Sequence, residues 1–186
     1  LIKFIEEGPE EVRFAAIRAT GGIGRAAAAA LPGLYATMKT PNPELRIQAL
    51  QALGHVEPDD DKLLPIVLKA LTDGGGVRRV AVVSLRRFGD KALPAVPALV
   101  EMLAREGDRA SALTTLRGIT IHDIEMLTSK LEDKTPAVRS FACEALGKLG
   151  PEAGAALPAL QLRAQYEGEP VRGVALKAIQ QIKGGK

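Results

Sequence analysis

One motif recurs six times along the chain and constrains the fold more than any other feature. An arginine is followed three residues later by an alanine, and successive arginines are 30 to 33 residues apart. An apolar residue precedes the arginine in five copies, and Asp108 takes that place in the remaining one. The pairs are Arg13 and Ala16, Arg46 and Ala49, Arg78 and Ala81, Arg109 and Ala112, Arg139 and Ala142, and Arg172 and Ala175. A period of this length predicts stacked copies of one supersecondary unit.

Each copy carries the apolar spacing of two helices. Counted from the residue before the arginine, mostly apolar residues recur at offsets 0, 4, 8 and 11, which is the helical period. A second apolar helix precedes each motif. In four copies it contains a proline, expected in the first turn where a missing N–H is tolerated: Pro32, Pro65, Pro97 and Pro158.

The two-helix pattern predicts an all-α chain, an α-solenoid or superhelix of about six antiparallel helix pairs. We expect a single solenoid over residues 1–186. Its repeats are expected at residues 1–23 (a partial repeat), 24–56, 57–88, 89–119, 120–149 and 150–183.

Two sequence segments resemble those of a known family. Val138–Gly150, which reads VRSFACEALGKLG, and the Ala-Leu-Pro-Ala-Leu run at 156–160 resemble the short bacterial HEAT repeats, including HEAT-like repeats of the phycobilisome lyase type. The resemblance implies an armadillo-like binding scaffold rather than an enzyme. A role as an accessory to a tetrapyrrole lyase is a weaker alternative that rests on the resemblance alone.

The repeated alanine and arginine have structural interpretations. A methyl group at a helix crossing lets two backbones approach to about 8 to 10 Å, so the alanine predicts close packing. The arginine lies at the start of the second helix, where the helix dipole disfavours a cation. Carboxylates of neighbouring loops are the expected partners, so we interpret the arginines as a structural ladder. Its members are Arg13, Arg46, Arg78, Arg109, Arg139 and Arg172.

The second helices carry most of the positive charge. Over offsets 0 to 11 they contain thirteen Lys and Arg but only two acidic residues, Asp108 and Glu144, although the net charge of the chain is only +3. The stripe at offsets 2, 6, 9 and 10 is expected to face outward and, by the resemblance, to line the concave surface. Its cations are the candidate partner-binding residues Arg18, Arg79, Arg86, Arg87, Arg117, Lys148 and Lys177.

These cations predict a non-catalytic scaffold that binds an acidic protein or peptide, because a basic groove attracts an anionic partner. Binding to the nucleic-acid backbone is the alternative, although few aromatic residues are available for base stacking. The same charges also suit an ordinary solvated helix face. The sequence does not separate these readings.

Composition offers little for catalysis, metals or cofactors, and none of these is expected. Cys143 is the only cysteine, and it takes a core position of its helix. His55 and His122 lie in different repeats without metal-ligand spacing. The run Gly22–Ala27 matches the dinucleotide fingerprint but follows a predicted helix instead of a strand. The acidic run at residues 57–61 lacks calcium-loop spacing and is interpreted as a solvated loop with a helix cap.

The ends of the chain carry their own expectation. Since Leu1 is not a methionine, we expect a fragment of a longer protein. Terminal apolar residues are expected to pair between copies or to lie under missing repeats: Leu1, Ile2, Phe4 and Ile5 at one end, and Ala175, Ile179 and Ile182 at the other. No stretch approaches the ~18 apolar residues of a membrane span. No targeting signal is recognisable, so the compartment is unknown, with the cytoplasm as the default expectation.

Overall fold

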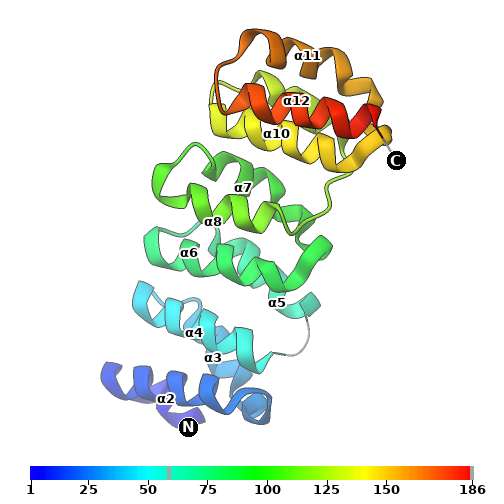
Figure 1. The fold of residues 1–186 in the computed structure, drawn as a ribbon. Helices are drawn as coiled ribbons and strands as arrows, with labels where there is room; N and C mark the ends of the chain where they lie inside the picture. The colour runs from blue at the N-terminus through cyan, green and yellow to red at the C-terminus, as the bar shows by residue number, and fades with distance from the viewer. Residues whose placement is uncertain (58–59, 185–186) are drawn as a thin grey trace. The chain divides into compact units, whose positions relative to one another are not determined.

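The computed structural model describes residues 1–57 and 60–184. Within these residues no strand is present, and the helices form six consecutive pairs, as the repeats predict for an α-solenoid (Figure 1). The first helices are α1 (Ile2–Glu7), α3 (Leu31–Thr37), α5 (Asp60–Ala70), α7 (Val96–Met102), α9 (Ile124–Ser129) and α11 (Leu157–Tyr166). The second helices are α2 (Glu10–Ile23), α4 (Pro43–Val56), α6 (Gly75–Ser84), α8 (Glu106–Leu116), α10 (Pro136–Leu149) and α12 (Val171–Lys183).

The chain divides into two compact units, Leu1–Ala95 and Val96–Lys186. In both units each first helix packs on the second helix of its own pair. Second helices also pack on one another, α2 on α4 and α4 on α6 in the first unit, and α10 on α12 in the second. The second helices of the first unit therefore lie side by side in the order α2, α4, α6 (Figure 1).

The repeated alanine is buried in all six copies. Ala16 is 4% exposed and the other five are fully buried. The offset-8 residues Leu53, Leu85, Leu116 and Leu146 are at most 1% exposed. The packing role expected for the alanine column is thereby confirmed, because small side chains at these positions let neighbouring helices approach closely.

Three glycines follow the second helices of the first, third and fifth pairs at equivalent positions of the repeat, Gly24 and Gly150 directly and Gly89 within the 3₁₀ segment that continues α6. Gly24, Gly89 and Gly150 have φ values of 68°, 52° and 60°, a backbone conformation that strains any side chain. Each belongs to a 3₁₀ segment that leads to the next pair: η1 (Gly24–Ala30), η2 (Leu85–Ala95) and η4 (Gly150–Ala156). A fourth segment, η3 (Lys130–Glu132), extends α9. The equivalent residues after α4 and α8, Glu57 and Thr120, have negative φ, so the positive-φ glycine occurs in alternate pairs.

Two local predictions were wrong. Helix α5 begins at Asp60, so Pro65 lies inside the helix rather than in its first turn. The early start is favoured by Asp61, since an acidic residue near a helix N-terminus is stabilising. Glu57 does not belong to a solvated loop, because it is only 4% exposed and accepts a hydrogen bond from the Tyr35 hydroxyl. Pro58 and Asp59 of the same run lie outside the described residues.

The expectation of outward-facing apolar residues at the ends was also largely wrong. Ala175 is fully buried, Ile182 is 5% exposed and Ile179 is half-buried. Helix α12 packs against both α10 and α11, and these helices cover its apolar stripe. Ile5 is also fully buried. The residues of α1 and its start that remain 41 to 55% exposed are Leu1, Ile2 and Phe4.

Candidate functional site

The arginine column contacts backbone carbonyl groups as well as carboxylates. Five of its six members donate hydrogen bonds of 2.7 to 3.3 Å to carbonyls at or just after the end of the preceding first helix. Such carbonyls lack intrahelical donors, and a cation near a helix C-terminus is favourable. The acceptors are Ile5 for Arg13, Thr40 and Pro41 for Arg46, Asp73 for Arg78, Leu103 for Arg109, and Asp133 and Lys134 for Arg139.

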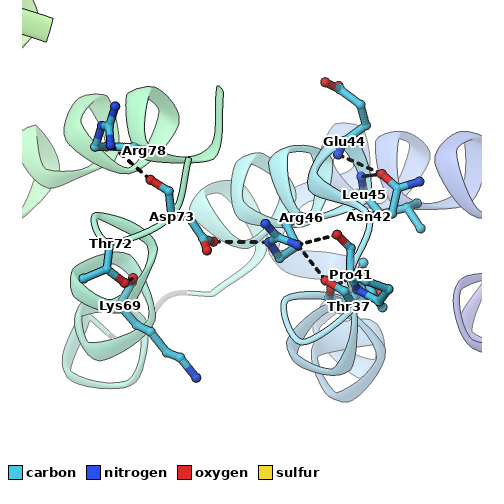
Figure 2. A network of polar contacts seen from close by, with 11 residues as sticks. Thr37, Pro41, Asn42, Glu44, Leu45, Arg46, Lys69, Thr72, Asp73 and Arg78 are labelled. Atoms are coloured by element: carbon cyan, nitrogen blue, oxygen red, sulfur yellow. Dashed lines mark hydrogen bonds and ion pairs between the residues drawn. The ribbon is translucent and has the colours of Figure 1, made fainter. Parts of the chain in front are cut away.

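Arg46 and Arg139 also have carboxylate partners. Arg46 Nε lies 3.2 Å from Asp73 Oδ2, and Figure 2 shows the guanidinium between this carboxylate and the carbonyls that follow α3. Arg139 Nη2 lies 2.8 Å from Glu167 Oε2, and the Arg139 hydrogen bond holds the pKa of Glu167 below its usual value. Arg172 makes no side-chain hydrogen bond or ion pair with any residue that the structure describes.

All seven candidate partner-binding cations are exposed. Arg18, Arg79, Arg86 and Arg87 belong to the first unit, and Arg117, Lys148 and Lys177 belong to the second. Their exposure agrees with the outward direction expected for their stripe.

The cations of the first unit lie on α2 and on α6 with its continuation into η2. We call Arg18, His55, Arg79, Arg86 and Arg87 the α2–α4–α6 basic face. No acidic residue occupies an outward stripe position on these three helices. Within the described residues, Arg18, Arg79 and Arg86 make no side-chain ion pair or hydrogen bond. Their positive charge is therefore available to a partner.

Arg87 connects η2 to α4 within this face. Arg87 Nη1 donates to the Gly54 carbonyl at 2.6 Å, so it reaches from η2 to the end of α4, where His55 follows. The Arg87 guanidinium also lies 5.5 Å from the centre of the Phe88 ring. A groove of about 500 Å³ between α2 and α4 continues the face, with Arg18, Gln48, Gln51 and His55 in its lining. The face thus combines cations with a recess that can receive a side chain.

The second unit neutralises part of its own positive charge. Arg117 and Glu144 form three hydrogen bonds of 2.8 to 3.1 Å, which hold the pKa of Glu144 below and that of Arg117 above the usual values. Lys148 Nζ lies 3.7 Å from the same carboxylate. A cleft of about 270 Å³ beside this cluster is lined by Ile119, Phe141 and neighbouring residues. Lys177, on α12, has no such partner among the described residues.

Sequence reasoning missed two contacts of these regions. Glu144 was counted among the two acidic residues of the second helices, but its pairing with Arg117, 27 residues away, was not foreseen. A spacing close to one repeat between an outward arginine and an outward glutamate is the signal that would have indicated it. The buried Tyr35–Glu57 hydrogen bond joins residues 22 apart and has no repeated counterpart that would reveal it.

The groups with reactive or metal-binding chemistry are dispersed or buried. Cys143 is fully buried, and burial raises the pKa of its thiol to about 11. Among the described residues, no group of three or more His, Cys, Asp or Glu side chains is placed to hold a metal ion. None of the helices in the described part of the chain has the length and apolar character needed to cross a bilayer.

Comparison with known proteins identifies the fold and the family. A family model described as HEAT repeats matches residues 1–86, 31–117 and 96–180. No curated protein matches the chain. A solved structure of computationally designed armadillo repeat proteins for modular peptide recognition has a TM-score of 0.59, with 18% identity over 97% of both chains.

Two further solved structures share the architecture. A designed armadillo repeat protein in complex with the peptide (KR)4 has a TM-score of 0.58, with 16% identity over 97% of both chains. An engineered protein has a TM-score of 0.55, with 20% identity over 99% of this chain and 95% of the other. At these identities the likeness establishes a shared fold, whereas the family matches together extend from residue 1 to residue 180. The chain therefore belongs to the HEAT repeat family.

Proposed function

We propose that this protein is a non-catalytic scaffold that binds an acidic segment of a protein partner on the α2–α4–α6 basic face. The observation that carries the proposal is that Arg18, Arg79 and Arg86 are exposed without an internal partner among the described residues. Uncompensated charge of one sign raises the local concentration of an oppositely charged partner and its association rate.

The face also offers contacts that select a peptide. Val83 is 55% exposed and lies one helical turn from both Arg79 and Arg87, so it provides an apolar contact between cations. The groove beside Arg18 and His55 can take a partner side chain. A segment that alternates acidic and apolar residues fits this arrangement. The peptide recognition named for the similar designed proteins supports this general mode of use, but the (KR)4 peptide is basic, and the charge of this face favours acidic residues.

The second unit is proposed as the weaker contributor. Glu144 holds Arg117 and lies close to Lys148, so an acidic peptide would have to compete with an existing carboxylate for both cations. Exposed ion pairs are individually weak, about 0.2 to 1 kcal/mol, so this competition lowers the affinity without abolishing it.

The test is a titration of the protein with a fluorescent peptide of alternating Glu and Leu, with fluorescent (KR)4 and with fluorescent duplex DNA, at three salt concentrations. We expect saturable binding of the acidic peptide and a loss of at least about tenfold in the Arg79→Glu/Arg86→Glu variant. Arg87 is left intact because its hydrogen bond to Gly54 supports the fold. The control is Lys3→Glu/Lys183→Glu, which changes the net charge equally at exposed positions away from the basic face.

Three outcomes would contradict the proposal. Equal weakening by the control variant would mean that net charge rather than the face attracts the peptide. A second outcome is tight binding of duplex DNA without peptide binding, with an affinity that falls steeply with salt and is lost in Arg79→Glu/Arg86→Glu. That result would mean that the partner of the face is a nucleic acid and not a protein. Absence of binding to every probe would leave the face as a solvated surface.

A further inference from the structure

A groove of about 730 Å³ lies on the first helices of the first unit, between α3 and α5 and apart from the α2–α4–α6 basic face. Its volume falls within the range of about 300 to 1,000 Å³ that is usual for small-molecule sites. The groove is lined by Tyr35, Met38, Lys39, Thr40, Arg46, Pro65, Ile66, Lys69, Ala70, Thr72 and Asp73.

The lining provides an apolar surface. Met38, at the end of α3, and Ile66, on α5, are half-buried. Also on α5, Ala70 is buried and Pro65 is exposed. Tyr35 adds a ring whose hydroxyl is fixed by its hydrogen bond to Glu57, so the aromatic edge has a defined position. These side chains offer contact to a ring or a short hydrocarbon chain.

The rim of the groove is positively charged on both sides. Lys39 follows α3 and Lys69 lies on α5; both are exposed and make no side-chain ion pair with the described residues. Figure 2 shows the Lys69 side chain extending from α5 toward α3. At the end of the groove, Asp73 is paired with Arg46 at 3.2 Å, which neutralises the only carboxylate of the lining. The lining therefore keeps an excess of two cations.

From this combination we propose that the α3–α5 groove binds a small amphiphilic anion, with an apolar ring or short chain on Met38 and Ile66 and one acidic head group between Lys39 and Lys69. Charge complementarity selects the anion, because two free ammonium groups flank an apolar floor. The groove volume limits the occupant to a small molecule. The site is independent of the peptide-binding proposal, because it uses none of the residues of the basic face.

The experiment compares two fluorescent probes that share their rings, 8-anilinonaphthalene-1-sulfonate, which is anionic, and N-phenyl-1-naphthylamine, which is neutral. We expect saturable binding of one sulfonate probe per chain and at least about tenfold weaker binding of the neutral probe, since a charge-assisted contact is lost. Lys39→Glu/Lys69→Glu should lower the affinity for the sulfonate probe by at least about tenfold. Lys3→Glu/Lys183→Glu, which has the same net charge, should leave the affinity for the sulfonate probe within about twofold.

A further variant separates a built site from simple attraction. Ile66→Lys adds a cation but removes the apolar floor, so the groove predicts weaker sulfonate binding, whereas attraction to surface charge alone predicts stronger binding. Circular dichroism and the protection of the Cys143 thiol establish that each variant is folded.

The proposal would be overturned by unchanged affinity in Lys39→Glu/Lys69→Glu or by stronger binding in Ile66→Lys. It would also be overturned if the fluorescence survived in both variants and disappeared in Phe4→Asp, because the probe would then lie on the exposed apolar residues of α1. The absence of saturable binding up to about 1 mM probe would exclude the site.

Discussion

Substitution of Arg139 by methionine should loosen α10 far more than the same substitution at Arg172, although both belong to the same repeated column. The Arg139 side chain is 15% exposed and donates to Glu167 at 2.8 Å and to the carbonyls of Asp133 and Lys134 at 2.8 and 3.1 Å. Arg172 is exposed and has no such partner among the described residues. The comparison therefore isolates the contacts from the residue type.

The magnitude follows from these contacts. Removal of one partner from a fully buried ion pair costs about 3 to 5 kcal/mol. Glu167 keeps a second ion pair with Arg163 at 3.2 Å, so its charge is not left uncompensated. We therefore expect Arg139→Met to lower the opening free energy of α10 by about 2 to 3 kcal/mol, a value between those for a buried and an exposed ion pair. For Arg172→Met the expected loss is less than about 0.5 kcal/mol.

The assay uses Cys143, the only cysteine, which lies fully buried on the same helix. Burial raises the pKa of its thiol to about 11, so a thiol reagent at neutral pH reacts after the helix opens locally. The labelling rate then reports the opening free energy. Arg139→Met should accelerate labelling by about 30- to 140-fold, because each 1.4 kcal/mol is a factor of ten. Acceleration below about threefold, or an equal effect of Arg172→Met, would refute the reasoning.

The same cluster gives a pH dependence. The folded-state pKa of Glu167 is lowered, chiefly by the hydrogen bond from Arg139. Its stabilising contribution is therefore complete above the ordinary carboxyl pKa of about 4.3 and is lost as the pH falls through the lowered value. Urea denaturation followed by circular dichroism should show less loss of stability on acidification in Glu167→Gln than in the natural sequence. Parallel pH profiles for the two proteins would contradict this assignment.

Three further predictions follow from particular positions. Gly150→Ala should lower the free energy of unfolding by about 1 to 2 kcal/mol in thermal denaturation, whereas Gly154→Ala should leave it almost unchanged. An added methyl group meets open space at both positions, but only Gly150 has positive φ. Equal losses of stability in the two variants would contradict the backbone argument. Ala81→Leu should destabilise by about 1 to 3 kcal/mol through overpacking, whereas Ala110→Leu on the exposed side of α8 should change stability by less than about 0.5 kcal/mol. Glu144→Gln should raise the affinity for the acidic peptide severalfold by releasing the two cations that it now neutralises; an unchanged affinity would mean that the second unit takes no part in binding.

The helical pairing and the alanine packing were predictable because both depend on periodic side-chain properties. The buried residues Ala49, Ala81 and Leu85 occupy positions that the helical period places on one face, and the structure buries them. The linkers were less predictable. The positive φ of Gly89 and Gly150 recurs only in alternate pairs, and the start of α5 at Asp60, ahead of Pro65, does not follow from the apolar period.

The arginine column shows why residue types alone were insufficient. The sequence contains carboxylates near each arginine, and these were the natural candidates for partners. Every helix also ends in carbonyl groups without intrahelical donors, and a sequence does not record where these groups point. Arg13 and Arg109 donate to such carbonyls, at Ile5 and Leu103, because the chain folds back from the first helix to the second. These arginines therefore join the two helices of a pair through backbone carbonyl groups. Such acceptors remain present when the acidic residues of the loops are substituted.

The same distinction determines which cations can serve a partner. The outward stripe treats Arg79, Arg87 and Arg117 as equivalent, because all three are exposed cations on second helices. The structure separates them: Arg117 is held by Glu144, Arg87 donates to the Gly54 carbonyl, and Arg79 has neither contact within the described residues. An exposed arginine attracts an anion only to the extent that internal acceptors leave its charge and donors available. The proposed recognition therefore depends on the cations that the internal pairings leave over, which in the first unit include Arg18 on α2, Arg79 on α6 and Arg86 on η2.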